Sequence, residues 1–149
     1  MSRFLMLGAL ALMAGCSTSA SDKWTKDRPK TFPAEGVVTY KGQGVEGASV
    51  TFAPTDRKGT AAYAITDAEG KFVLNTFGDK DGAAAGEYTV TITKKQTDTT
   101  QNPKDPNGPP LKSVEKSLIP ARYASSGTSK LTASVKDGGE NKFTFELKD

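Results

Sequence analysis

The stretch YAITDAEGKFVLNT, residues 63–76, predicts a strand, a tight turn and a second strand. The turn is expected at the central DAEG, because an aspartate side chain bonds to its own turn and a glycine accepts positive φ. Tyr63 and Ile65 share one face of the strand before the turn, and Phe72 and Leu74 share one face of the strand after it. We therefore expect a hairpin whose aromatic residues point into a core.

The same period of two recurs along the chain, at residues 35–41, 45–54, 87–93, 130–136 and 141–148. Each segment is short and has one apolar face, and two sheets packed face to face would bury such strands. The sequence therefore predicts an all-β fold over residues 34–149, a seven-stranded antiparallel β-sandwich in which the last two strands form a hairpin through DGGE. The residues expected on the inner faces are Ala48, Val50, Phe52, Tyr63, Phe72, Tyr88, Val90, Ile92, Leu131, Ala133, Val135, Phe143, Phe145 and Leu147.

Residues 94–117 break this alternation and hold four of the eight prolines. A segment of that length and polarity inside a small domain indicates a long mobile loop. Its lysines make it mildly basic, and we expect them to serve as solubilising charge. They are Lys94, Lys95, Lys104, Lys112 and Lys116.

The first sixteen residues, MSRFLMLGALALMAGC, have the pattern of a signal sequence. Arg3 precedes an apolar run at residues 4–13, which is too short to span a bilayer as a mature helix. Small residues follow, and then Cys16, the single cysteine of the chain. We predict a signal peptide over residues 1–15 in which Cys16 is a specific part of the processing site. The alternative is an ordinary signal peptide that a cysteine follows by chance.

Residues 16–33 are polar, lack periodicity and contain Pro29 and Pro33, so we expect a flexible tether. Trp24 lies inside it. That residue fits a membrane interface or a partner surface, and it equally fits a solitary, loosely packed aromatic. We favour the last reading.

The composition excludes several classes of function. The chain has no histidine, which removes Ser-His and Cys-His catalysis and the commonest metal ligand. A single cysteine cannot form an internal disulfide. A formal charge of +3 is too weak and too scattered to indicate nucleic-acid binding. We expect no catalytic activity and no cofactor.

The segment around Cys16 resembles the lipobox of bacterial lipoproteins, although Met13 stands where leucine is usual. The resemblance implies cleavage before Cys16 and a diacylglycerol, carrying fatty acids such as palmitate, on its sulfur. It places the protein in the cell envelope, anchored to a membrane by lipid. Ser17 takes the position of the inner-membrane retention aspartate, which favours the outer membrane, at its periplasmic or surface face.

The segment VVTYKGQGVEGASVTFAP, with the TDAEGKF turn and GEYTV, resembles the carboxypeptidase regulatory-like domains, which are transthyretin-like prealbumin sandwiches. The tail LIPARYASSGTSKLTASV is similar to a group of small bacterial lipoproteins with this domain. The resemblance implies a non-catalytic structural or interaction module, with an envelope protein or a polysaccharide as partner. The alternative is a carbohydrate-binding or surface-adhesion module.

Three weaker site hypotheses remain. Asp79 and Asp81 have the D-x-D-G spacing of a calcium loop, but the closing glutamate is missing, so a solvated turn is the better interpretation. Related pilin-like sandwiches carry a Lys-Asn isopeptide, for which Lys41 and Asn141 are the positional candidates, although the required acid is absent. Tyr123 is expected to cap one end of the sandwich rather than to bind a ligand.

Overall fold

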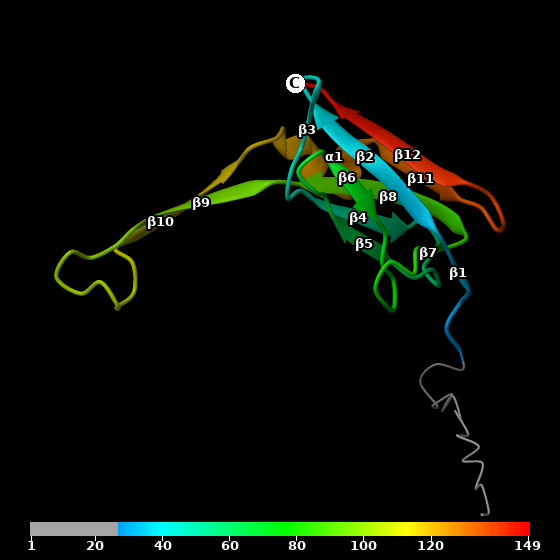
Figure 1. Cartoon of the computed structure of the whole chain (residues 1–149), viewed down its shortest axis with the longest axis horizontal. Helices are drawn as coiled ribbons and strands as arrows, with labels where there is room; N and C mark the ends of the chain where they lie inside the picture. Colours follow the sequence, from blue (N-terminus) through cyan, green and yellow to red (C-terminus); the bar gives the residue numbers. More distant parts are fainter. Residues whose placement is uncertain (1–26) are drawn as a thin grey trace, which may run out of the picture.

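The structure, a computed structural model, describes residues 27–149 and is an all-β sandwich of two sheets (Figure 1). Sheet I has the strand order β11-β8-β4-β5 and is antiparallel throughout. Sheet II is centred on β2, which pairs with β12, β3 and β6. The strands of sheet I are β4 (Ser49–Pro54), β5 (Ala62–Ile65), β8 (Gly86–Thr93) and β11 (Leu131–Val135). Those of sheet II are β2 (Ala34–Tyr40), β3 (Gln43–Gly44), β6 (Lys71–Val73) and β12 (Asn141–Leu147).

One pairing in sheet II is parallel, which the sequence did not predict. Strand β12 runs alongside β2 in the same direction, with Asn141 opposite Ala34 and Leu147 opposite Tyr40. Parallel neighbours need a long connection, and here nearly the whole domain lies between the two strands. The prediction of a purely antiparallel sandwich was therefore wrong at this pair.

The core lies between the sheets and centres on Phe52. Its ring centroid is 5.2 Å from that of Phe143, 5.7 Å from Tyr88, 6.1 Å from Phe145 and 6.3 Å from Phe72. Two of these rings belong to sheet I and three to sheet II, so the cluster joins the layers. The other predicted inner positions are buried too, except that Leu131 and Phe143 are half-buried and Tyr63 is outside.

Tyr63 corrects the predicted faces of β5. Its side chain is 54% exposed, and Ile65 is also exposed, whereas Ala62 and Ala64 face the core. The ladder explains this, because residues directly opposite each other point to the same face. Ala62 pairs with the inward Phe52, so Tyr63 must point outward beside Thr51.

Two predicted hairpins are instead corners between the sheets. The DAEG turn forms as expected, with Asp67 Oδ1 accepting the N–H groups of Glu69 at 2.9 Å and Lys71 at 2.8 Å, and Gly70 at φ +79°. However, β5 belongs to sheet I and β6 to sheet II, and the two strands do not pair; an isolated bridge joins Tyr63 of β5 to Asn75, which lies just after β6. The DGGE segment likewise links β11 of sheet I to β12 of sheet II. Alternation identifies strands but not their neighbours.

The ordered domain begins earlier than predicted. Strand β1 (Thr31–Phe32) pairs with β7 (Ala83–Ala84), and the Phe32 side chain is buried. The end of the predicted tether at residue 33 is therefore part of the sandwich. The predicted signal peptide at 1–15, Cys16 and Trp24 lie outside the described residues.

Two short helices close one end of the sandwich. They are η1 (Ala121–Ala124), a 3-10 helix, and α1 (Ser126–Ser129). Tyr123 of η1 is buried, and its hydroxyl donates to the Lys148 carbonyl at 3.2 Å and accepts from the Lys148 N–H at 3.0 Å. The predicted capping role of Tyr123 is confirmed. No helix in residues 27–149 is long and apolar enough to cross a membrane.

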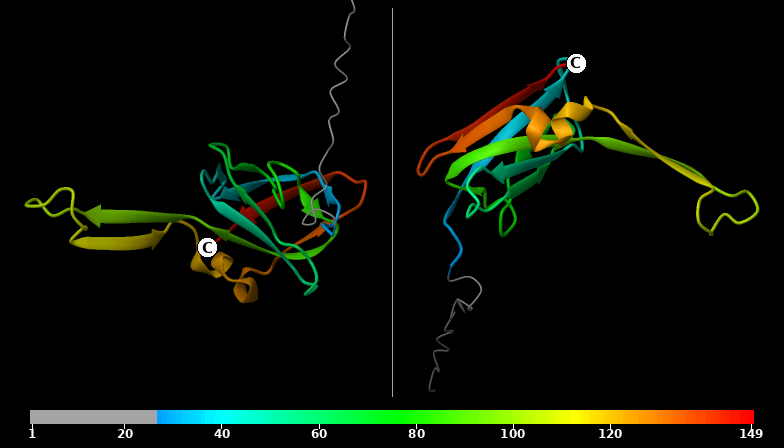
Figure 2. Two further views of the ribbon diagram at one scale, coloured as in Figure 1. Left: turned by 90° about the horizontal axis from the view of Figure 1, so that it is seen from below. Right: turned by 180° about the vertical axis from the view of Figure 1, so that it is seen from behind.

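The predicted mobile loop at 94–117 contains regular structure. Strands β9 (Lys95–Thr100) and β10 (Lys112–Ser117) form an antiparallel ribbon that projects from the sandwich (Figures 1 and 2). The prolines lie in the tip that joins the two strands, outside the paired region. Their concentration there explains why the segment was predicted to be a loop.

Candidate functional site

The β9–β10 arm, residues 94–118, is the feature of the described chain that most invites a function. Strand β9 continues the direction of β8 beyond the edge of sheet I, and β10 returns alongside it (Figure 2). The N–H of Leu118 donates to the carbonyl of Lys94 at 2.8 Å and closes the base. Every residue of both strands is exposed. A two-stranded ribbon is only marginally stable alone in water, so contact with a partner surface would stabilise this one.

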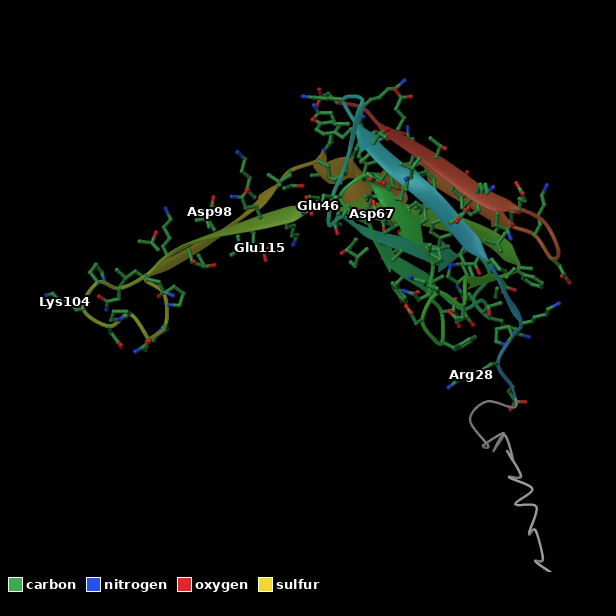
Figure 3. All side chains as sticks on the ribbon, viewed as in Figure 1. Arg28, Glu46, Asp67, Asp98, Lys104 and Glu115 are labelled. Atoms are coloured by element: carbon green, nitrogen blue, oxygen red, sulfur yellow. The ribbon has the colours of Figure 1, made fainter. Side chains whose placement is uncertain are left out.

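The tip of the arm is held by local hydrogen bonds. Asn102 and Asp105 form a bridge, and the Lys104 N–H donates to the Asn102 side chain at 3.0 Å. The N–H of Leu111 returns to the carbonyl of Thr100 at 2.9 Å. Lys104 marks the far end of the arm in Figure 3.

The register of the ribbon gives it two faces of different charge. Opposite residues in an antiparallel pair share a face, and neighbours along a strand alternate. One face, here called the neutral face, has one lysine and one glutamate, which form a salt bridge at 2.9 Å. The neutral face consists of Lys95, Thr97, Thr99, Ser113, Glu115 and Ser117.

The other face, here called the basic face, carries two exposed lysines and one aspartate. None of its lysines lies within 4.0 Å of a carboxylate in residues 27–149. Asp98 accepts from the Gln96 side chain at 2.9 Å. Figure 3 shows side chains projecting from both sides of the ribbon, with Asp98 and Glu115 labelled. The basic face consists of Gln96, Asp98, Thr100, Lys112, Val114, Lys116 and Leu118. Lys94 begins the same row at the base of the arm, but it is half-buried and its ammonium group lies against Gly47 of the sandwich.

This two-faced pattern was missed by reading 94–117 as an irregular loop. The sequence KSVEKSL does alternate, with Lys112, Val114, Lys116 and Leu118 at every second position. That signal could have identified β10 as a strand, whereas the face that it shares with β9 depends on the register between the two strands. The prolines of the tip led instead to the prediction of a loop over the whole segment.

Asp79 and Asp81, the weak calcium candidates, lie in the 76–82 loop, and the hydrogen bonds of Asp81 stabilise that loop. Asp81 accepts the N–H groups of Thr76 at 2.7 Å, Phe77 at 2.9 Å and Gly78 at 3.0 Å. Both oxygens of its carboxylate are thereby engaged, and Asp79 is exposed on the same loop. No group of three or more acidic or other ligating side chains occurs within the described part of the chain.

These hydrogen bonds also set the protonation of Asp81. Partial burial by itself would raise the pKa of the carboxyl. The backbone N–H groups of Thr76, Phe77 and Gly78 outweigh that effect and hold the pKa below its ordinary value of 3.8. Asp81 therefore stays ionised and fixes the 76–82 loop.

The geometry excludes the Lys-Asn crosslink. Asn141 lies opposite Ala34 at one end of β2, whereas Lys41 follows the other end. Their separation along the strand is on the order of 20 Å at the usual rise per residue. Lys41 instead pairs with Asp149 at 3.1 Å, and the buried Asn141 side chain bonds to backbone groups of its own corner, including the Lys136 N–H at 2.8 Å.

A surface depression of about 440 Å³ lies over sheet II, and apolar and charged side chains line it together. Its lining includes Glu35, Gly36, Phe72, Lys142 and Phe143. The buried polar side chains in residues 27–149 are Thr66, Ser129 and Asn141, none of which is acidic.

The exposed aromatic residues of the described region do not form a strip. Tyr63 lies on the outer face of β5, and Phe77 lies in the loop after β6, where the Arg28 guanidinium is 5.0 Å from the centroid of its ring. Tyr63 is therefore an isolated exposed aromatic ring and not part of a row of such rings.

Comparison with known proteins adds little. No protein-family model matches the chain, and no curated protein matches it significantly. Among solved structures it is similar to part of a 9R-lipoxygenase from Cyanothece PCC8801, at 12% identity and a TM-score of 0.34. The match covers 83% of this chain and 17% of that one. A likeness this low carries no argument about function.

Proposed function

We propose that this protein is a lipid-anchored component of the cell envelope whose β-sandwich acts as a non-catalytic structural or interaction module. The observation that carries the proposal is the position of Cys16, which follows a signal-like apolar run and two small residues and precedes the start of β1 by fifteen positions. A lipid on that cysteine would hold the sandwich close to a membrane. Ser17 favours the outer membrane over the inner.

Lipid labelling and fractionation test this anchor. Cells producing the wild type or Cys16→Ser are fed a radiolabelled fatty acid and separated into soluble and membrane fractions. The wild type should be labelled and recovered with the outer membrane. Cys16→Ser should be unlabelled and uncleaved, and Ser17→Ala, which keeps the cysteine, should behave as the wild type. A labelled Cys16→Ser protein would contradict the proposal.

The β9–β10 arm supports the interaction role. It extends an ordered, fully exposed ribbon away from a sandwich that has a complete core without it. Such a projection contributes contact surface rather than stability. Pull-down from crosslinked cells, with a variant that lacks residues 96–116 as comparison, should show envelope components that are lost with the arm.

Carbohydrate binding is a second candidate because Tyr63 is exposed. Its ring stands beside Thr51 on the outer face of sheet I, which also presents hydroxyl groups from β8. An exposed aromatic ring next to polar groups is suited to stacking against a sugar. Electrophoresis through gels containing envelope polysaccharide should show retardation that Tyr63→Ala abolishes. Equal mobility of both proteins with and without the polysaccharide would eliminate this candidate.

A further inference from the structure

We propose that the basic face of the β9–β10 arm binds the surface of an anionic lipid bilayer. This inference rests on the proposed lipid anchor, which supplies the nearby membrane. It reassigns Lys112 and Lys116 from solubilising charge to a recognition surface. The reason is that the β9–β10 ribbon holds both lysines on one exposed face.

The chemistry of the basic face is that of a membrane-surface contact. Lys112 and Lys116 alternate with Val114 and Leu118, so short apolar side chains lie between cationic ones. Lysines on an amphipathic element attract anionic headgroups, while apolar residues on the same face enter the boundary below them. On the neutral face, Lys95 and Glu115 neutralise each other in a salt bridge, so this face does not present unpaired lysines.

A protein partner fits this surface less well. Protein interfaces are enriched in aromatic residues and arginine and depleted in lysine, and their binding energy concentrates in tryptophan, tyrosine and arginine. Residues 94–118 contain none of these three and no phenylalanine. The arm thus lacks the anchors that a protein pocket would receive.

The anchor makes a weak surface contact sufficient. Each lysine near an anionic bilayer strengthens binding by roughly fivefold, and Asp98 opposes part of that gain. Such a contact would be weak for a free protein. Tethering raises the effective concentration of the arm at the membrane, so the contact becomes occupied without further affinity.

The chain is long enough for this arrangement. The described N-terminal end lies on the far side of the sandwich from the arm (Figure 1). Fourteen residues lie between Cys16 and Thr31, and this connection spans at most about 50 Å when extended. That reach allows the domain to lie on its side with the arm along the bilayer.

Two adjacent threonines of β9 give a matched test. Thr100 lies on the basic face opposite Lys112, and Thr99 lies on the neutral face opposite Ser113. Full-length Thr100→Cys and Thr99→Cys proteins are purified in lipidated form and labelled with an environment-sensitive fluorophore. They are then reconstituted into vesicles of phosphatidylcholine, or of equal parts phosphatidylcholine and phosphatidylglycerol, that contain nitroxide-bearing lipids as quenchers. Labelling of the parent chain shows whether Cys16 is blocked.

The proposal expects quenching of the Thr100→Cys label in anionic vesicles, several-fold stronger than that of the Thr99→Cys label. The difference should disappear in pure phosphatidylcholine and in ~1 M salt, which shortens the screening length to about 3 Å. Adding Lys112→Glu should reduce the quenching several-fold, whereas Lys95→Glu, an equal charge change on the neutral face, should leave it unchanged.

Other outcomes overturn the inference in separable ways. Vesicle flotation without quenching of either label would leave the anchor intact and show that the arm does not bind lipid, which would favour a protein partner. Equal quenching of both labels would show that the bilayer does not bind the basic face in preference to the neutral face. Failure to float, with Cys16 open to labelling, would overturn the anchor and this inference together.

Discussion

Phe72 connects the turn of the opening stretch to the centre of the core. Its ring is buried, 6.3 Å from Phe52 of sheet I and 6.2 Å from Phe145 of sheet II. Phe72 thus belongs to the aromatic cluster that joins the two sheets. Lys71, one position earlier, is exposed and pairs with Glu69 at 2.8 Å.

Phe72→Ala should therefore lower the free energy of unfolding by about 3–5 kcal/mol, through lost transfer energy and a cavity. Lys71→Ala is the matched control and should cost no more than about 0.5 kcal/mol, because its salt bridge is exposed. Urea melts of both variants, made without the first sixteen residues, measure the contrast. A comparable loss in each would mean that the register of β6 is wrong.

Asp81 provides a pH-dependent prediction. Because the folded-state pKa is held below its ordinary value, the carboxylate contributes stability that is present above that value. The contribution is lost as the pH falls through the lower, folded-state pKa. Asp81→Asn, which puts an amide N–H₂ against backbone N–H donors, should cost about 1–2 kcal/mol at neutral pH.

Urea melts of the wild type and Asp81→Asn from pH 7 downward measure this effect. The stability difference between the two proteins should be constant at neutral pH and shrink below about pH 4 as Asp81 becomes protonated. A difference that does not change with pH would show that the ionised carboxylate is not what holds the 76–82 loop.

At the scale of elements, the arm should be dispensable for folding. Residues 96–116 are removed and Lys95 is joined to its partner Ser117 by Asn-Gly, a favoured two-residue hairpin turn. Because β9 and β10 are exposed and loop closure depends only weakly on length, stability should change by about 1 kcal/mol or less. Circular dichroism and urea melts check this. A shortened protein that does not fold would show that the arm is needed by the sandwich.

The elements also show how far the sequence could predict the fold. Alternation located the main strands, and in β4, β8 and β12 the apolar side chains left no doubt about the inner face. In β5 both faces are apolar, and only the pairing of Ala62 with Phe52 shows that Tyr63 points outward. The sequence likewise did not show which strands pair, because local alternation does not distinguish a hairpin within one sheet from a corner between two sheets.

The candidate site was less predictable than the fold. The sequence supplied the lysines of residues 94–117 but not their grouping, since a face exists only once β9 and β10 pair in one register. Tyr123 was placed correctly at an end of the sandwich. Asp81 was recognised as a turn residue, whereas the three amide groups that it binds could not be deduced from spacing.

For the whole molecule, the account joins three parts: a lipid-bearing Cys16, a compact sandwich that starts at β1, and an arm that projects from it. The sandwich provides the rigid body, and the arm provides a contact surface away from the core. The anchor is the part on which the proposed location and the proposed role of the arm both depend.

Mass spectrometry of the N-terminal peptide of the mature protein, isolated from its native envelope, tests that anchor most directly. The account predicts that the mature chain begins at Cys16 and that its sulfur carries diacylglycerol. A chain that begins elsewhere, or a Cys16 with a free thiol, would contradict it.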